Sequence, residues 1–367
     1  MRVLYFSRDY TSHDRRFLES LSGTEHHVFY LRLEEPSGLE TRPLPDRIQP
    51  LRWGSDFTDE ESRIQRLREL LEELDPDVIH AGPVQACAYL AAKAGAGALA
   101  TMSWGSDILV DARSGSGRSK ASFALQHSAV FLCDCDAVRA EAITLGMPAD
   151  RIVVFPWGVD LDHFSPGTGL EIRRSLGWED AFVVLSSRSF EPIYGVDTLV
   201  KAWMAAARAN PRLRLLLLGK GSGEAALRAM LDDAGLTERV HFAGQVGFDA
   251  LPQYLRAADV YVSASHSDGS SISLLEAMAC GLPALVSDIP GNREWVGPED
   301  NGWWFRDGDE QDLADHLQEV ACPGTELHRL GNRGRQIALA RADWGLNFQK
   351  MLAGYEIART GKTGMKV

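Results

Sequence analysis

Short apolar runs alternate with helix-like segments along nearly the whole chain of 367 residues. The first run, residues 3–6, precedes a polar loop and a helical pattern that includes Phe17, Leu18 and Leu21. Strands that alternate with helices form parallel sheets covered by helices on both faces. The alternation therefore predicts an α/β fold. In such folds ligands bind at the carboxyl ends of the strands, so the residues that follow each strand are where a site is expected.

The second half of the chain repeats this rhythm and indicates a second α/β unit. Strands are expected at 181–186, 213–218, 239–242, 259–263 and 283–286, and helices at 196–209, 223–234, 249–256, 271–280 and 310–320. In the first half, residues 34–56 are rich in Pro and are expected to be mostly irregular. A Pro- and Gly-containing stretch at 165–169 fits a linker between domains. The expected architecture is two Rossmann-like domains with parallel sheets facing an interdomain cleft.

Charge and cysteine content narrow the functional class. The chain has 38 Lys plus Arg against 51 Asp plus Glu, a formal charge of −13, which argues against a nucleic-acid partner because nucleic-acid binding needs a basic surface. Five cysteines, an odd number, are expected to be reduced thiols in a cytoplasmic protein. No apolar run approaches the roughly 20 residues of a membrane span, and the N-terminal run is too short for a signal peptide. Peripheral contact with the inner face of the plasma membrane stays open.

The segment between the fourth and fifth of these strands gathers small and acidic residues. It reads Ser265-His-Ser-Asp268-Gly269-Ser270-Ser271-Ile272-Ser273-Leu-Leu-Glu276-Ala-Met-Ala-Cys-Gly281-Leu-Pro283. Small residues at 269–271 let a ligand approach the backbone, and amides at the helix start, near 271–273, suit a phosphate. Asp268 and Glu276 can point into the same crevice, where carboxylates suit sugar hydroxyls. The spacing alone equally fits a helix capped by Ser271 with a solvated Glu276.

This segment resembles the donor-site signature of glycosyltransferase family 4, whose members are retaining enzymes with two Rossmann-like domains (the GT-B fold). The family pattern Glu-Gly-aromatic-Gly-Leu-x-Leu-Leu-Glu-Ala-Met-Ala-x-Gly-x-Pro is followed to Pro283, with Asp268 for the first Glu and serines at 270 and 271. The resemblance implies that Asp268 contacts the donor sugar and Glu276 the nucleotide ribose. It also implies a donor site that includes Gly269, Ser270, Ser271, Ile272 and Ser273.

The resemblance extends over nearly the whole chain. Residues 153–164 look like the family's interdomain segment, and Gly219-Lys220-Gly221 resembles its Gly-x-Gly turn after a strand. Residues 240–244, ending in Gly244, resemble the base-binding region. The implied domains are an acceptor-binding domain at 1–164, a nucleotide-sugar-binding domain at 165–343, and a helix at 344–367 that returns to the first domain.

One departure from the family concerns the phosphate site. Relatives usually have an Arg and, five or six residues later, a Lys, and both bind the donor pyrophosphate; here Arg188 matches but Tyr194 stands where the Lys belongs. A charged donor is stronger than a neutral phenol. Three interpretations stay open: Tyr194 donates one hydrogen bond and the helix starts suffice, Lys220 or an arginine of the first domain supplies the charge, or the leaving group is a nucleoside monophosphate. Arg188, Asp268 and Tyr194 are the predicted catalytic residues, and Glu191 is predicted to bind the donor.

Polar residues after the strands of the first half suggest an acceptor side. The loop at residues 7–17 lacks a Gly-x-Gly-x-x-Gly pattern, and its His13, Arg15 and Arg16 suit an acidic acceptor or a leaving phosphate. The alternative is a helix start capped by Ser12 or Asp14, with solvated arginines.

Three more residues complete the predicted acceptor side. Trp104 stands where relatives often have His and suits either a platform for a sugar ring or core packing. Asp107 belongs to the same loop. His80 either takes part in the site or is a packed histidine at a strand end.

The resemblance implies a retaining, hexosyltransferase-like enzyme of the kind used in polysaccharide biosynthesis. It would move a sugar from a nucleotide sugar to a hydroxyl of a glycan, a glycolipid or a small molecule. Neither a cofactor nor a metal is expected, because the protein supplies cations and helix N-termini, and Asp134-Cys-Asp136 precedes a helix of the first domain. Two alternatives stay open: a GT-B nucleotide-sugar epimerase or hydrolase, and a non-catalytic protein that binds sugar nucleotides.

Overall fold

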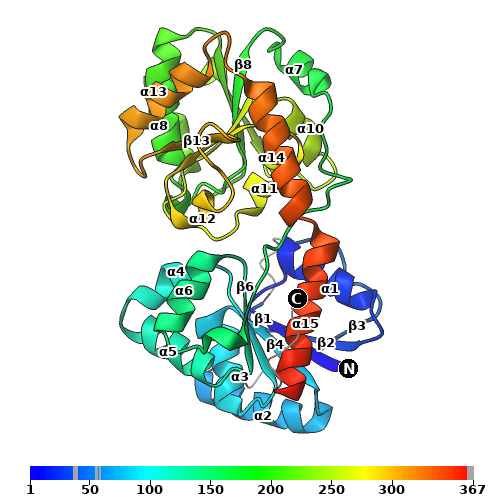
Figure 1. Cartoon of the computed structure of the whole chain (residues 1–367). Coiled ribbons are helices and arrows are strands. Elements are labelled where there is room, and N and C mark those ends of the chain that lie inside the picture. Colours follow the sequence, from blue (N-terminus) through cyan, green and yellow to red (C-terminus); the bar gives the residue numbers. More distant parts are fainter. Residues whose placement is uncertain (36–39, 54–56, 58, 362–367) are drawn as a thin grey trace. The chain divides into compact units, whose positions relative to one another are not determined.

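The computed structural model describes residues 1–35, 40–53, 57 and 59–361. The chain forms two compact units (Figure 1): Met1–Pro156 with Leu346–Val367, and Trp157–Gly345. The expected boundary at 164/165 differs from this division, because Val159, Leu161 and Phe164 are buried in a core of the second unit. Arg335 anchors this segment by donating hydrogen bonds to the carbonyl oxygens of Leu161 and Phe164.

The first unit contains a parallel sheet with the order β3-β2-β1-β4-β5-β6-β7. Its strands are β1 (Arg2–Ser7), β2 (His27–Arg32), β3 (Ile48–Pro50), β4 (Val78–Gly82), β5 (Leu99–Met102), β6 (Val130–Cys133) and β7 (Ile152–Val154). Its helices are α1 (Ser12–Ser22), α2 (Glu60–Leu74), α3 (Tyr89–Ala94), α4 (Ser106–Leu109), α5 (Gly115–Gln126), α6 (Asp136–Thr144) and most of α15 (Trp344–Thr360). Residues 36–39 and 54–56 of the stretch predicted as irregular lie outside the described residues, and β3 lies between them.

Helix α1 starts at a capping box rather than at the predicted caps. Thr11 is the N-cap residue, its hydroxyl accepts from the amide of Asp14, and the Asp14 carboxylate accepts from the amide of Thr11. Reciprocal bonds of this kind satisfy two amides that the helix itself cannot pair. The alternative in which Ser12 or Asp14 is the cap residue is therefore wrong, although Asp14 takes part in the motif.

The last helix joins the first unit, as the returning helix at 344–367 was expected to do. Tyr355 of α15 lies with its hydroxyl 2.6 Å from Nδ1 of His80 in β4. Gly354 permits close packing there, because a Cβ at this position would lie 2.6 Å from a methyl carbon of Leu132. Residues 362–367 of the predicted segment lie outside the described residues.

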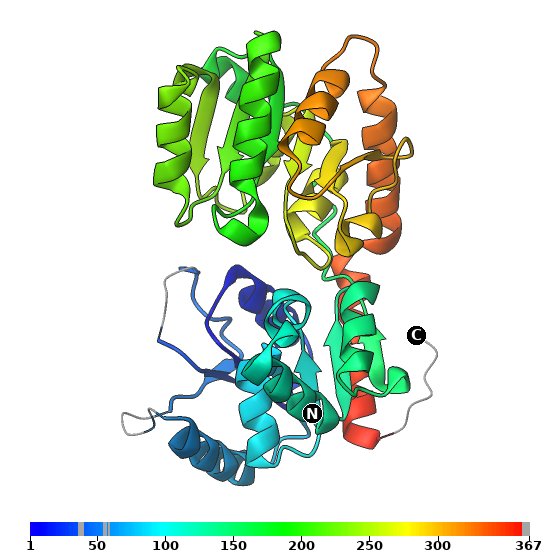
Figure 2. The same ribbon diagram turned by 90° about the vertical axis from the view of Figure 1, so that its left-hand side faces the viewer.

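The second unit contains a parallel sheet with the order β10-β9-β8-β11-β12-β13. Its strands are β8 (Phe182–Ser186), β9 (Leu213–Leu218), β10 (Val240–Gly244), β11 (Val260–Ser263), β12 (Ala284–Ser287) and β13 (Gly302–Phe305). Its helices are α7 (Leu170–Leu176), α8 (Val196–Ala209), α9 (Glu224–Asp233), α10 (Leu251–Arg256), α11 (Ile272–Ala279), α12 (Pro290–Arg293), α13 (Glu310–Val320) and α14 (Leu327–Arg341). Figure 2 shows helices on both faces of its sheet.

Two apolar layers hold the second sheet. One contains Trp203 of α8 with Leu217 of β9, and the other contains Tyr261 of β11 with Leu275 and Met278 of α11. The strands β8, β9 and β11 run parallel to one another. The loops that follow them therefore emerge at the same edge of the sheet, where the predicted donor residues are found.

Among the residues that the structure describes, no helix is both long enough and apolar enough to cross a membrane.

Candidate functional site

Arg188, directly after β8, lies at the centre of a polar cluster. Its Nη1 donates to Oγ of Ser271 at 2.7 Å and to Oγ of Ser273 at 3.0 Å. Its Nη2 lies 2.7 Å from Oδ2 of Asp268, and only 10% of the Arg188 side chain is exposed. The ring of Tyr194 completes the cluster, with its centroid 4.1 Å from Cζ of Arg188.

This environment keeps the guanidinium charged. Burial is the largest influence and favours the neutral form, but Asp268 together with Tyr261, Tyr194 and Glu276 outweighs it, and the pKa of Arg188 lies above its ordinary value. Burial in turn raises the pKa of Asp268, and the adjacent Arg188 opposes that shift. The two residues therefore form a desolvated ion pair at the edge of the sheet.

Donor groups beside Arg188 lack acceptors. Its Nε is buried and finds no acceptor among the described residues, and the hydroxyls of Ser186 and Ser187 likewise have no hydrogen-bond partner there. A buried donor without an acceptor is costly. An oxygen of a bound ligand would satisfy Nε of Arg188. The start of α11 is close in space, because Ser271 and Ser273 accept from Nη1 of Arg188, and amides at a helix start also suit an anion.

Ser271 occupies the N-cap position of α11, but its hydroxyl does not cap the helix. It accepts a hydrogen bond from Arg188 instead. The alternative of a capping Ser271 therefore does not describe this helix start. Glu276 lies half-buried on the same helix, as does Ile272 at its first position.

Tight packing fixes the loop that carries Asp268. A Cβ at Gly291 of α12 would lie 2.4 Å from the carbonyl oxygen of Asp268 and 2.5 Å from that of Gly269. Ser270, predicted to bind the donor, accepts a hydrogen bond of 3.0 Å from Nε1 of the buried Trp295. The hydroxyl of Ser270 thus binds Trp295 and helps to hold the loop in place.

The glycine turn after β9 lies directly against the Arg188 loop. A Cβ at Gly219 would lie 2.5 Å from the carbonyl oxygen of Arg188, and one at Gly221 would lie 2.6 Å from the carbonyl carbon of Phe190. Glu191 joins the two segments, because its carboxylate accepts from the amide of Ser222 at 2.8 Å and from its hydroxyl at 2.6 Å. These bonds lower the pKa of Glu191. Glu191 therefore holds the two loops together.

Lys220 is exposed, and its side chain extends toward the end of β10. Its Cε lies 3.7 Å from where a Cβ would stand at Gly244, which has a φ of +68°. Lys220 and Gly244, both predicted donor residues, are thus brought together at one end of this edge.

In the first unit, two predicted acceptor residues come together. The rings of His13 and Trp104 have centroids 6.0 Å apart, although they follow different strands. Arg15 is half-buried and donates to the carbonyl oxygen of Pro43 at 2.6 Å. Arg16, also half-buried, lies in the same turn of α1.

Asp107 supports the backbone around it. Its Oδ1 accepts from the hydroxyl of Ser103 at 2.6 Å and from the amides of Trp104 and Ile108, and its Oδ2 accepts from the amide of Val84 at 2.9 Å. Burial raises its pKa. This carboxylate holds the loop that presents Trp104.

His80 is a packed strand-end histidine, which confirms that interpretation of the sequence. It is 1% exposed, and its ring lies 4.6 Å from that of Tyr5. Burial lowers its pKa to about 3, so the imidazole is neutral. Its contact with Tyr355 joins the last helix to the sheet.

Sequence reasoning missed Tyr261 of β11. Its hydroxyl lies 2.8 Å from Oγ of Ser273 and so extends the Arg188 cluster into the core. Its position could have indicated this role, because Tyr261 carries a hydroxyl and lies on the strand that precedes the loop of Asp268.

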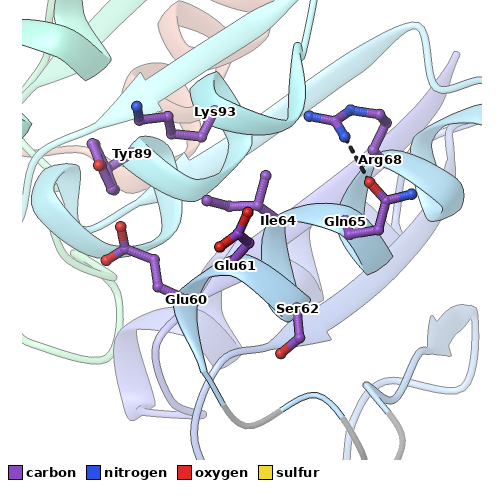
Figure 3. Close-up of a pocket in the computed structure, with 8 residues that line it drawn as sticks. All are labelled: Glu60, Glu61, Ser62, Ile64, Gln65, Arg68, Tyr89 and Lys93. Atoms are coloured by element: carbon purple, nitrogen blue, oxygen red, sulfur yellow. Dashed lines mark hydrogen bonds between the residues drawn. The ribbon is translucent and has the colours of Figure 1, made fainter.

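A surface depression lies between α2 and α3 (Figure 3), away from the predicted site residues. It is lined by Glu60, Glu61, Ser62, Ile64, Gln65, Arg68, Tyr89 and Lys93. Several of its polar groups bond to protein: Arg68 donates to Gln65 at 2.7 Å, and Lys120 donates to Glu60 at 2.6 Å. We assign it no role.

In the described ranges, no group of three His, Cys, Asp or Glu side chains could hold a metal ion. All five cysteines are free thiols.

Two family models match the chain. Glycosyltransferase Family 4 matches residues 15–163, and Glycosyl transferases group 1 matches residues 170–337. D-inositol 3-phosphate glycosyltransferase of Actinosynnema mirum is 32% identical over 236 residues, which cover 60% of this chain and 56% of the relative.

A second relative comes from Corynebacterium glutamicum. It is a GDP-mannose-dependent monoacylated alpha-(1-6)-phosphatidylinositol monomannoside mannosyltransferase, 28% identical over 207 residues that cover 53% of this chain and 54% of the relative. The chain thus spans little more than half the length of these curated relatives.

Solved structures share the fold. Anabaena Alr3699/HepE, in complex with UDP, matches with a TM-score of 0.82 at 19% identity and covers 97% of this chain and 100% of its own. Sucrose-phosphate synthase of Thermosynechococcus elongatus matches with a TM-score of 0.81 at 20% identity, over 99% of this chain and 100% of its own. These likenesses show the GT-B fold. The two matched segments, with the motif from Asp268 to Glu276, show that the chain belongs to glycosyltransferase family 4.

Proposed function

We propose that this protein transfers a sugar from a nucleotide-sugar donor to a hydroxyl of an acceptor. The observation that carries the proposal is the buried Arg188, whose Nε lacks an acceptor among the described residues at the edge where α11 begins. A guanidinium in this position suits the phosphate of a nucleotide. The printed names of the relatives support the class, since they are glycosyltransferases.

In this proposal Arg188 and the amides at the start of α11 stabilise the leaving phosphate, and Asp268 and Glu276 bind the sugar and the ribose. The bond between the anomeric carbon and the donor phosphate breaks, and a bond to the acceptor oxygen forms on the same face of the sugar. The acceptor proton passes to the leaving phosphate. The anomeric configuration is thereby retained without a protein nucleophile, and catalysis rests on positioning and charge stabilisation.

We further propose that the reaction needs no metal ion. Arg188 offers a permanent charge and the helix start offers aligned amides, which are the groups that stabilise a leaving phosphate in the absence of a cation.

The acceptor would bind to the first unit, near His13 and Trp104, whose rings adjoin. The names of both relatives include an inositol phosphate or a phosphatidylinositol group. An acceptor with a phosphate would suit Arg15 and Arg16 in the first turns of α1. If the acceptor is lipid-linked, a cytoplasmic enzyme would contact the membrane surface peripherally.

The test begins with thermal-shift measurements against nucleoside mono- and diphosphates of the five common bases. The matching nucleotide sugars are then incubated with the protein and with inositol phosphate or phosphatidylinositol acceptors, with and without EDTA. NMR of the product reports its anomeric configuration, and NMR without acceptor separates transfer from epimerisation or hydrolysis. We expect Glu276→Ala to weaken nucleotide binding. If no nucleotide shifts the protein and no nucleotide sugar is consumed, the proposal is wrong.

A further inference from the structure

Tyr194 stands at the position where the family usually has a phosphate-binding lysine. Its ring, rather than its hydroxyl, meets the proposed donor site: the ring centroid lies 4.1 Å from Cζ of Arg188. Cation–π attraction operates at this distance and is strongest when the cation is desolvated. With 10% of its side chain exposed, Arg188 is such a cation.

The ring of Tyr194 is itself held in place. It ends a 3₁₀ turn, Pro192–Tyr194, in which the amide of Tyr194 donates to the carbonyl oxygen of Glu191 at 2.9 Å. The turn is tied to the loop after β11, because His266 donates its amide to the carbonyl oxygen of Ile193 at 2.9 Å. These bonds fix the backbone that carries the ring, and the ring itself packs, partly buried, against the apolar layer that contains Trp203.

The neighbours of Arg188 hold its guanidinium in one orientation. Tyr194 covers one face, Ser271 and Ser273 accept from Nη1, and Asp268 lies against Nη2. Nε remains without an acceptor from the described residues. A long side chain that is already ordered loses little further rotamer entropy when a ligand binds.

We infer that Tyr194 is a positioning residue, which orders Arg188 through its ring so that Nε can meet a phosphate oxygen of the donor. This inference rests on the proposed function and adds a specific role for the residue that replaces the family lysine. Tyr194 contributes no charge to the site. It compensates for the absent lysine by ordering Arg188, which lowers the entropic cost of binding a phosphate to this guanidinium.

Two variants separate the ring from the hydroxyl. Tyr194→Phe keeps the ring, and we expect its affinities for UDP and GDP to stay within about twofold of the wild-type values. Tyr194→Leu removes the ring, and we expect about tenfold weaker binding of whichever of these nucleotides the wild type binds. Isothermal titration calorimetry measures both. Weak binding by Tyr194→Phe, or unchanged binding by Tyr194→Leu, would overturn the inference.

A ligand-free measurement keeps the inference distinct from the proposed function. The Nε–H resonance of Arg188 is identified in ¹⁵N NMR spectra as the peak that Arg188→Lys lacks. We expect the peak to keep its position in Tyr194→Phe and to move in Tyr194→Leu, which has no ring current. An unmoved peak in Tyr194→Leu refutes the positioning role even if no nucleotide binds, whereas a lack of nucleotide binding by the wild type refutes the proposed function alone.

A matched control tests for general damage. Phe123→Leu removes a ring that lies 4.6 Å from Nζ of Lys93 in the first unit. This variant also loses a cation–π contact, but far along the chain from Arg188. Its nucleotide affinity and the Arg188 resonance should equal those of the wild type.

Discussion

Gly195 follows Tyr194 and packs closely against Ala264, the residue after β11, which precedes the loop of Asp268. Replacing Gly195 by Ala should therefore lower the stability of the protein and displace both segments. Its φ is +56°, and a Cβ there would lie 2.1 Å from the carbonyl oxygen of Ala264. Gly177 offers a matched comparison in the same unit, since its φ is +65° but nothing lies within 4 Å of the added carbon.

The two costs can be worked out from this difference. Each variant places an Ala in the left-handed region, at about 1 kcal/mol. Gly195→Ala must in addition open a 2.1 Å contact by nearly 1 Å against the backbone of a buried loop, a form of overpacking that costs about 1–3 kcal/mol. We expect Gly177→Ala to lose about 1 kcal/mol of unfolding free energy and Gly195→Ala about 2–4 kcal/mol.

Urea unfolding followed by tryptophan fluorescence measures both values on the same transition. Nucleotide affinity gives a second readout: Gly195→Ala should bind more weakly because the turn beneath Arg188 is displaced, and Gly177→Ala should bind as the wild type does. Equal losses of stability in the two variants, or an intact affinity in Gly195→Ala, would refute the reasoning.

Two further predictions concern charge. Burial lowers the pKa of His80 from 6.5 to about 3. As the pH falls below 6.5, the histidine becomes protonated in the unfolded chain but not in the folded protein, so the free energy of unfolding decreases. His80→Gln, which can still bond to Tyr355, should escape this loss; relative to the wild type it should gain about 3 kcal/mol between pH 7 and pH 4.5 in urea unfolding, and a difference that ignores pH would contradict the assignment. Asp268→Asn removes an anion beside Arg188 and should bind UDP or GDP about three- to tenfold more tightly by calorimetry while transferring sugar more slowly. Asp259→Asn, which breaks another ion pair of this unit, should leave affinity unchanged, and a tighter complex there would show that the effect is not local.

Local sequence patterns predicted most helices and strands, and the resemblance to the family predicted the residues at the centre of the candidate site. The helix at 196–209 coincides with α8, and Arg188 and Asp268 lie in contact after neighbouring strands. The helix follows from periodicity, whereas Arg188 was predicted from the resemblance to the family, and Asp268 from that resemblance and from the rule that ligands meet the carboxyl ends of parallel strands. The strand β3 was missed because it lies in a Pro-rich stretch and ends at Pro50, and β13 because it begins with Gly302.

The roles of individual side chains depend on contacts that no spacing reveals. Glu191 is paired with Ser222, 31 residues later. Asp107 accepts from the amide of Val84, 23 residues earlier, and Ser270 accepts from Trp295, 25 residues later. Each of these side chains is of a type that binds ligands, and only the fold shows that it binds protein.

The glycine turn after β9 has a consequence for how such a site can be altered. Gly219, Gly221 and Gly223 each lie too close to the backbone of residues 188–190 to admit a Cβ without movement. A larger residue in the turn would therefore push on the backbone of residues 188–190 and displace the guanidinium of Arg188 without contacting it. A turn taken from another enzyme would no longer fit against this backbone. Residues 188–190 and the glycine turn at 219–223 therefore have to be exchanged together. Exchanging both should keep the guanidinium of Arg188 in place, and exchanging either one alone should displace it.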